Sequence, residues 1–203
     1  QNLITADFNL DNKLDLATAN QTSGDISVLL NNCTVTCSGT FANANNITIS
    51  DIAGPQSSTI ADFNRDGLLD LATANPGNGN ISLLLATGNN SFSGTNNFAT
   101  GGIQPFSLTN GDFNRDGNFD IATVDVATNN VYVLLGDGTG NLGVSNTTQL
   151  TSSQPVAILT ADFNRDGLLD LATANAGSNT ISLLFGLGDG TFNIPIDFNL
   201  NGG

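Results

Sequence analysis

Apolar residues occur along this chain in short runs, and glycine, asparagine and aspartate lie between the runs. The last repeat shows the pattern most clearly, with apolar runs at 156–163, 169–175, 180–185 and 191–200 and turn-forming segments at 175–179 and 186–190. Runs of this length that are rich in Ile, Leu, Val, Phe and Thr are typical of β-strands and are too short for helices. We therefore predict four short antiparallel strands in this repeat and no helix anywhere.

The same arrangement occurs four times. An oxygen-rich segment follows the first run of each repeat and begins at Asp7, Asp62, Asp112 and Asp162, so successive starts are 55, 50 and 50 residues apart. A period of this size indicates a propeller, a solenoid or an array. Four short antiparallel strands per repeat is the plan of a propeller blade. Residues 1–203 are thus predicted to form one all-β domain, a β-propeller of four four-stranded blades of about 50 residues each.

The two ends of the chain leave the closure of this propeller open. Gln1 aligns with Phe106, and Gly202-Gly203 aligns with Gly101-Gly102, so the chain begins close to the place in the repeat where it stops. In one geometry the last strand completes the first blade and closes a four-bladed ring. In the other it continues to a further repeat, in a longer chain or a neighbouring subunit, as part of a larger propeller or array.

The charge of the chain is concentrated in the four segments at 7–15, 62–70, 112–120 and 162–170. The net charge is −14, all 18 acidic residues are Asp, and 12 of them lie in these loops, three per loop. An acidic protein of this kind lacks the basic face that nucleic acid or an anionic membrane surface requires. No apolar run is long enough to span a bilayer, so we predict no membrane insertion. The repeated local acidity indicates cation binding.

Within each loop the oxygen-bearing side chains alternate. With the first Asp as position 1, they fall at positions 1, 3, 5 and 9, and the backbone carbonyl of position 7 adds another oxygen. Hard oxygen ligands in a flexible loop suit Ca²⁺ better than Mg²⁺ or a softer metal. We predict about four Ca²⁺ ions with these ligands: Asp7, Asn9, Asp11, Lys13 and Asp15; Asp62, Asn64, Asp66, Leu68 and Asp70; Asp112, Asn114, Asp116, Asn118 and Asp120; Asp162, Asn164, Asp166, Leu168 and Asp170.

Position 6 is expected to turn the loop sharply, since Gly67 and its equivalents adopt positive φ without strain. The first copy departs from the pattern with Leu10 at position 4 and Asn12 at position 6. The loops differ from EF-hands because Thr stands at position 12 in place of the bidentate Glu and the flanks are strands. The alternative interpretation is that Asp, Asn and Gly serve here only as turn formers.

Two further loop positions recur. Phe8, Phe63, Phe113 and Phe163 stand at position 2 and are predicted to point into the core. Arg65, Arg115 and Arg165 stand at position 4 and are expected to moderate repulsion within the loops. A rim that contacts anions or glycans is the alternative for these arginines.

Cys33 and Cys37 are the only cysteines, and a pair four residues apart fits a small local disulfide better than a zinc half-site without His. A disulfide favours an extracellular setting. Six Asn-x-Ser/Thr triplets point the same way and suggest glycosylation, at Asn20, Asn32, Asn46, Asn80, Asn89 and Asn146.

The combination of these motifs resembles the FG-GAP/VCBS repeat family, whose members include the propeller heads of integrin α subunits. The resemblance rests on Asp-Phe-Asn-Arg-Asp-Gly-Leu-Leu-Asp-Leu-Ala at 62–72 and 162–172, Ile-Ser-Leu-Leu at 81–84 and 181–184, and Gly-Asp-Gly-Thr-Phe at 188–192. It implies a β-propeller with calcium in the hairpin loops, and it implies that the oxygens at positions 1, 3, 5 and 9 are the ligands. Propellers of this family usually have seven or eight blades, more than the four repeats here.

No catalytic site stands out in the sequence. His is absent, which excludes Ser/His/Asp and Cys/His arrangements, and the clustered Asp residues are assigned to metal. The catalytic alternative is a glycosidase-like Asp pair, and nothing singles one out among Asp25, Asp51, Asp125, Asp137, Asp189 and Asp197.

We therefore expect a non-enzymatic, extracellular, calcium-stabilised module for adhesion to, or recognition of, glycans or proteins. One alternative is a structural subunit of a fibre or surface assembly that associates with itself through its terminal strand. Another is an accessory domain of a larger secreted enzyme.

Overall fold

The computed structural model describes residues 2–33, 40–49 and 54–200. Cys37 and Asp51, together with Gln1 and Gly202-Gly203 at the ends, lie outside the described residues. Every regular element in the described part of the chain is a β-strand, and the strands form four four-stranded antiparallel sheets. The predicted all-β propeller of four blades is confirmed.

The strand bounds follow the repeat. Blade 1 contains β1 (Leu3–Ala6), β2 (Asp15–Asn20), β3 (Asp25–Leu29) and β4 (Asn45–Thr48). Blade 2 contains β5 (Ser57–Ala61), β6 (Asp70–Asn75), β7 (Asn80–Gly88) and β8 (Ser91–Ala99). Blade 3 contains β9 (Pro105–Gly111), β10 (Asp120–Asp125), β11 (Asn130–Gly136) and β12 (Leu142–Gln149). Blade 4 contains β13 (Pro155–Ala161), β14 (Asp170–Asn175), β15 (Thr180–Leu184) and β16 (Ile196–Asn199).

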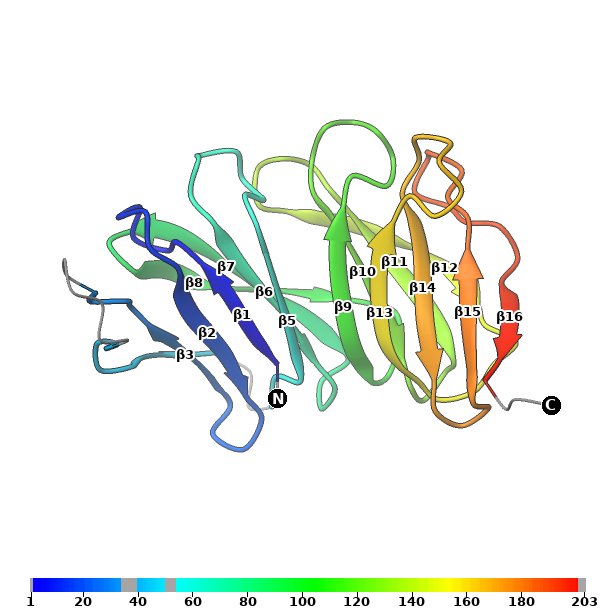
Figure 1. Ribbon diagram of the computed structural model, residues 1–203, viewed down its shortest axis with the longest axis horizontal. Coiled ribbons are helices and arrows are strands. Elements are labelled where there is room, and N and C mark those ends of the chain that lie inside the picture. The colour runs from blue at the N-terminus through cyan, green and yellow to red at the C-terminus, as the bar shows by residue number, and fades with distance from the viewer. Residues whose placement is uncertain (1, 34–39, 50–53, 201–203) are drawn as a thin grey trace.

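Each blade is built from four strands that are consecutive in the chain. The first strands β1, β5, β9 and β13 follow one another along an arc, and blades 1 and 4 lie at opposite ends of it (Figure 1). β16 pairs with β15, and blade 1 is completed by its own β4. The C-terminal strand therefore does not complete the first blade.

The core lies between the blades. Each blade has two faces. We call the face that packs on the next blade along the chain the forward face, and the face that packs on the preceding blade the rear face. In each of the three contacts between blades, a forward face packs on a rear face. Between blades 2 and 3, for example, Ala74, Ile81 and Leu83 of the forward face pack with Ile121 and Leu134 of the rear face. Equivalent clusters join blade 1 to blade 2 and blade 3 to blade 4. Small alanines opposite large aliphatic side chains bring the sheets close together.

The loop phenylalanines belong to the same contacts, with one exception. Phe8, Phe63 and Phe113 are buried, and each packs edge-to-face on an aromatic ring of the following blade. Phe163 was predicted to be buried too, and this prediction is wrong, since the residue is 43% exposed. It belongs to blade 4, and none of the other three described blades covers it.

The strand predictions for blade 4 hold except at its outer edge. The apolar run at 191–200 contributes only an isolated bridge at Phe192 and the short strand β16. Pro195 precedes β16 directly, and proline has no N–H to donate to a sheet. The strand therefore begins at Ile196.

Candidate metal-binding loops

The four acidic loops connect the first and second strands of their blades. They lie on the same rim of the molecule, at the top of Figure 1. The repeat thus places four copies of one oxygen-rich loop along one edge, each supported by a packed sheet.

Within the loop at 62–70, the carboxylate of position 1 organises the turn. Asp62 accepts hydrogen bonds from the backbone N–H groups of Asp66 and Gly67, at 3.1 and 2.9 Å. The amide oxygen of Asn64 accepts a second bond from the N–H of Asp66 at 3.1 Å, and Asp66 accepts one from Leu68 at 2.8 Å. The loops at 112–120 and 162–170 repeat this set. Hydrogen bonds from the backbone N–H groups of the loop to its own side-chain oxygens therefore fix the shape of the loop.

The backbone reverses at two positions. Gly67 has a φ of 85° at position 6, as predicted, and Asn12 adopts a φ of 63° at the same place in the first loop. Position 4 is also left-handed in all four copies, with φ angles of 60° at Leu10 and Arg65, 61° at Arg115 and 63° at Arg165. Sequence patterns did not predict this second reversal, because Leu and Arg rarely adopt positive φ.

The carboxylate at position 9 differs from the others because it is fully buried. Asp70 accepts hydrogen bonds from the N–H of Phe63 and from the N–H of Ala86, both at 2.8 Å. Asp15, Asp120 and Asp170 accept the same two bonds, one from position 2 of their loop and one from a residue at or near the C-terminal end of the third strand. This carboxylate ties the loop to its own blade.

The local charge around two of these buried groups is unfavourable. Burial raises the pKa of Asp70 to about 6, bonds from the Ala86 and Phe63 N–H groups oppose the rise, and repulsion from Asp66 and Asp62 adds to it. The pKa of Asp120 is raised to about 6 for the same reasons, by burial and then by Asp116 and Asp112. A cation bound in these loops would relieve the repulsion.

The donor set fits a hard cation. Each loop presents the carboxylates of positions 1 and 5 and the amide oxygen of position 3 at its exposed end, and these oxygens keep lone pairs beyond the N–H bonds they accept. Within the described ranges, no three His, Cys, Asp or Glu side chains form a metal-binding group. The third carboxylate of each loop, at position 9, is buried and accepts two backbone N–H bonds from its own blade. Its role as a ligand remains a prediction, as do the other ligands.

The first loop has its own counter-ion. The ammonium of Lys13 lies 3.0 Å from a carboxylate oxygen of Asp11, and its hydrogen bond lowers the pKa of that carboxyl group. The equivalent positions of the other loops carry Leu68, Asn118 and Leu168. A cation in the first loop would therefore compete with Lys13.

One of the loop arginines, Arg65, connects neighbouring blades. Arg65 donates a hydrogen bond to the carbonyl of Gly117, in the loop of blade 3, at 2.6 Å. This contact is consistent with moderating repulsion between acidic loops. A sequence alignment of the repeats could not reveal it, because the acceptor is a backbone group of another blade.

The aspartates outside the loops have local tasks. Asp125 is buried and accepts bonds from the N–H groups of Ile103, Gln104, Ala127 and Thr128. Hydroxyl or amide groups bond to the others in the described part of the chain, Asp25, Asp137, Asp189 and Asp197. These bonds give each carboxylate a structural role.

A polar hollow of about 400 Å³ lies near the N-terminal ends of β1, β5, β9 and β13, the first strands of the blades, which we call the inner strands. It is lined by Asn2, Gln56, Ser57, Phe106, Ser107 and Val156, from all four blades. The side-chain oxygen of Gln56 is buried and has no hydrogen-bond partner among the described residues. These residues lay outside the motifs that sequence reasoning singled out, since no pattern marks them.

Fold and loops together define a β-propeller with acidic hairpin loops. A family model described as FG-GAP-like repeat matches residues 7–73, 62–123 and 112–173. The chain therefore belongs to the FG-GAP-like repeat family, as the resemblance of its motifs implied. Comparison with curated proteins gives no match.

Solved structures share the fold at low identity. A functionally unknown protein from Desulfotomaculum acetoxidans matches with a TM-score of 0.68 and 17% identity over 98% of this chain and 55% of that one. An Agrocybe aegerita lectin, which recognises non-reducing terminal N-acetylglucosamine, matches with a TM-score of 0.63 and 19% identity over 97% of this chain and 51% of the lectin. Virginiamycin B lyase from Staphylococcus aureus matches with a TM-score of 0.60 and 14% identity over 93% of this chain and 53% of the lyase.

This chain thus spans about half the length of each of these proteins. A lectin and a lyase share the fold, so the fold alone does not separate binding from catalysis. The described residues include no helix with the length and apolar character to cross a membrane.

Proposed function

We propose that this chain is a calcium-stabilised, extracellular recognition module that binds a glycan or protein and catalyses no reaction. The polar hollow at the inner strands carries the proposal. Its lining combines amide and hydroxyl groups with the ring of Phe106, a combination suited to hydrogen bonding and stacking with a polar ligand. None of these side chains ionises near neutral pH, so the hollow offers binding groups without an acid–base pair.

The unpartnered oxygen of Gln56 gives the ligand a chemical requirement. A buried amide acceptor without a donor is costly, and a ligand hydroxyl or amide N–H that donates to it removes the cost. Sugars and polypeptides both supply such donors. The lectin with the same fold makes glycans the first class to test.

Calcium and location rest on separate observations. Four preformed oxygen-donor loops on one rim support a structural role for calcium, in which the ion joins positions 1, 3 and 5 of each loop. The disulfide at Cys33 supports an oxidising, extracellular setting, although Cys37 lies outside the described part of the chain.

The test is binding to a glycan array and to a panel of extracellular-matrix proteins, in calcium and in excess EGTA. We expect selective binding that Gln56→Ala weakens at least about tenfold, the loss expected from one buried hydrogen bond of roughly 1.5 kcal/mol. Gln21→Ala, at an exposed residue of another turn, serves as the matched control and should bind as the parent does. Absence of selective binding on both panels, or equal binding by Gln56→Ala, contradicts the proposal.

A further inference from the structure

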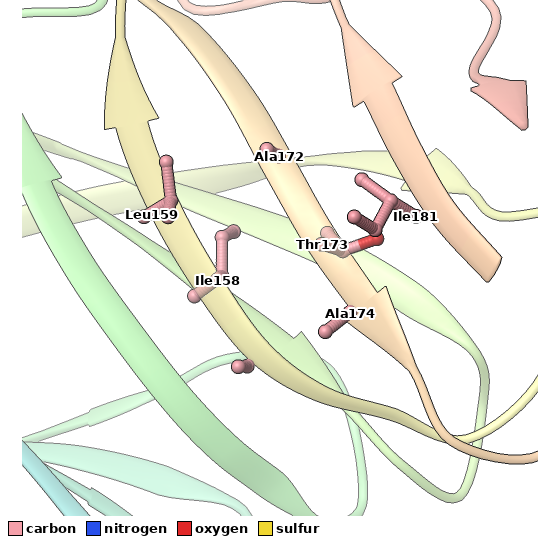
Figure 2. A pocket seen from close by; sticks show the side chains of 7 residues that line it. Ile158, Leu159, Ala172, Thr173, Ala174 and Ile181 are labelled. Carbon is pink, nitrogen blue, oxygen red and sulfur yellow. The ribbon is translucent and has the colours of Figure 1, made fainter. Parts of the chain in front are cut away.

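The forward face of blade 4 is apolar and uncovered. Leu159 of β13 is 53% exposed, Ala174 of β14 is exposed, and Ile181 of β15 is partly exposed. Figure 2 shows these side chains, with Ala172, around a shallow hollow of about 140 Å³ whose lining is almost wholly apolar. A face of this kind in water carries the unfavourable hydration that blade contacts elsewhere in the molecule remove.

The same residues are buried in blade 2. Ala72, Ala74, Ile81 and Leu83 are identical to Ala172, Ala174, Ile181 and Leu183, and they occupy the same paired positions in their sheets. In blade 2 all four are fully buried in the cluster that packs on the rear face of blade 3. The covered copy therefore shows what fits this surface, which is the rear face of another blade.

Such a rear face is free at the other end of the molecule. In blade 1, Leu16 pairs with Leu29 and Thr18 pairs with Ser27, and all four are partly exposed. The rear faces of blades 2 and 4 carry the same Leu–Leu and Thr–Ser pairs, and there all eight residues are buried. The leucines of these pairs belong to the clusters that join each blade to the preceding one. Leu3 adds to this surface at 62% exposure, whereas its equivalents Ser58, Leu108 and Ile158 are buried.

The loop residues at the two ends are complementary as well. Phe8, Phe63 and Phe113 each pack on an aromatic ring of the next blade, at Phe92, Phe119 and Phe192. Phe163 packs on no such ring among the residues that the structure describes, and it is exposed. In blade 1 the residue equivalent to Phe92 and Phe192 is Phe41, and the residue equivalent to Phe119 is Leu14, and both are exposed.

We infer that the forward face of blade 4 binds the rear face of blade 1 of a second copy of this chain. Phe163 then packs on Phe41 and Leu14, and Ala174 and Ile181 pack on the Leu16–Leu29 pair. Two copies that make this contact in both directions enclose eight blades in one ring.

A second copy is the occupant that satisfies both ends together. Each end of the molecule presents the half-interface that the other end lacks, down to the paired residues and the loop aromatic. An unrelated partner would have to reproduce one of these faces without using the other. Edge pairing of β16 with a neighbouring chain, by contrast, would leave both faces uncovered.

The test is the mass of the 203-residue chain by light scattering, in calcium, over a range of concentrations up to about 100 µM. We expect twice the monomer mass of 20.8 kDa. Leu159→Glu and Leu3→Glu each place a charge on one of the two faces at an exposed position, and each should weaken self-association at least about tenfold while the thermal melt is kept. Ile103→Glu, at an equally exposed residue outside both faces, is the matched control and should associate like the parent.

Mixing the two face variants identifies the orientation of the contact. The intact forward face of Leu3→Glu can bind the intact rear face of Leu159→Glu, so the mixture should recover a dimer that neither variant forms alone. A parent chain that stays monomeric at every concentration overturns the inference. Dimers of Leu3→Glu alone would mean that two forward faces meet, and loss of association in Ile103→Glu would mean non-specific association; either result also overturns it.

Discussion

Blades 2 and 4 share the sequence from Ala61 to Asn75 and from Ala161 to Asn175 without a change, but their environments differ. Phe63 is 2% exposed, and Phe163 is 43% exposed. Ala74 is fully buried and Ala174 is exposed. One sequence therefore forms the same strands and the same loop in both places, while its forward face is a core in one blade and a surface in the other. Local structure comes from the repeat itself, and burial comes from the neighbouring blade.

The comparison can be tested with matched substitutions in the two blades. All stability measurements should be made in the Leu3→Glu background, in which the forward face of blade 4 stays free even if the parent chain self-associates. Chemical unfolding then reports the free energy of unfolding of each variant against that background.

The largest difference is expected for a charge on the forward face. Ala74→Asp places a carboxylate in the packed contact between blades 2 and 3 and should cost about 5 kcal/mol, enough to remove cooperative unfolding. Ala174→Asp places the same group in water and should change stability by less than about 0.5 kcal/mol. Equal losses in the two variants would show that the forward face of blade 4 is covered within the chain.

A smaller difference is expected for the loop phenylalanines. Phe63→Ala removes a buried ring and its contact with Phe119, whose centroid lies 6.3 Å away, and should cost about 3–4 kcal/mol. Phe163→Ala should cost roughly 1 kcal/mol, because about half of its surface is already in water. Urea unfolding measures both, and a loss at Phe163 as large as that at Phe63 would refute the assignment of Phe163 to an open face.

The comparison should vanish at position 9. Asp70 and Asp170 are both buried and each accepts two backbone N–H bonds within its own blade. Asp70→Ala leaves two buried N–H donors without partners and should cost about 2–3 kcal/mol in EGTA. Asp170→Ala leaves one buried donor and the partly buried N–H of Phe163 and should cost a similar amount. Unequal losses would mean that neighbouring blades contribute to this site. Asn78→Ala, in an exposed turn, is a neutral control.

The smallest effect is expected at the loop arginines. Arg65→Ala removes one exposed hydrogen bond to the carbonyl of Gly117 and should cost about 0.5–1 kcal/mol, with a smaller loss in high salt. Arg165 lies in blade 4, and no described blade follows it in the same copy. Arg165→Ala should therefore leave the free energy of unfolding unchanged. If both variants lose the same stability, the bond between blades is not the source of the effect.

The repeat made much of this structure predictable. The spacing of the loops, the short apolar runs and the turn residues predicted four four-stranded blades, because strand formation and hairpin turns depend on nearby residues. The positive φ at Gly67 followed from the same local reasoning. The exposure of Phe163 could not be predicted from the repeat, since the burial of this position depends on the next blade along the arc.

Other features of the site depend on contacts that sequence patterns do not contain. The sequence identified position 9 as a metal ligand, but the bonds that it accepts from residues at or near the end of the third strand depend on the folded blade. The hollow around Gln56 combines residues from four inner strands that share no motif. The left-handed φ at Arg65 is a property of the closed loop, in which Asp62 and Asn64 draw two backbone N–H groups inwards.

The central claim is that the four loops bind calcium, and native mass spectrometry in about 1 mM calcium tests it most directly. We expect up to four bound ions per chain, with the loop that contains Lys13 filled last. A double variant with Asp62→Ala and Asp66→Ala should hold one ion fewer, while Asp25→Ala, at a partly exposed aspartate outside the loops, should retain the full number. A chain that binds no calcium under these conditions would contradict the account, and the loops would then be turns stabilised by their own backbone bonds.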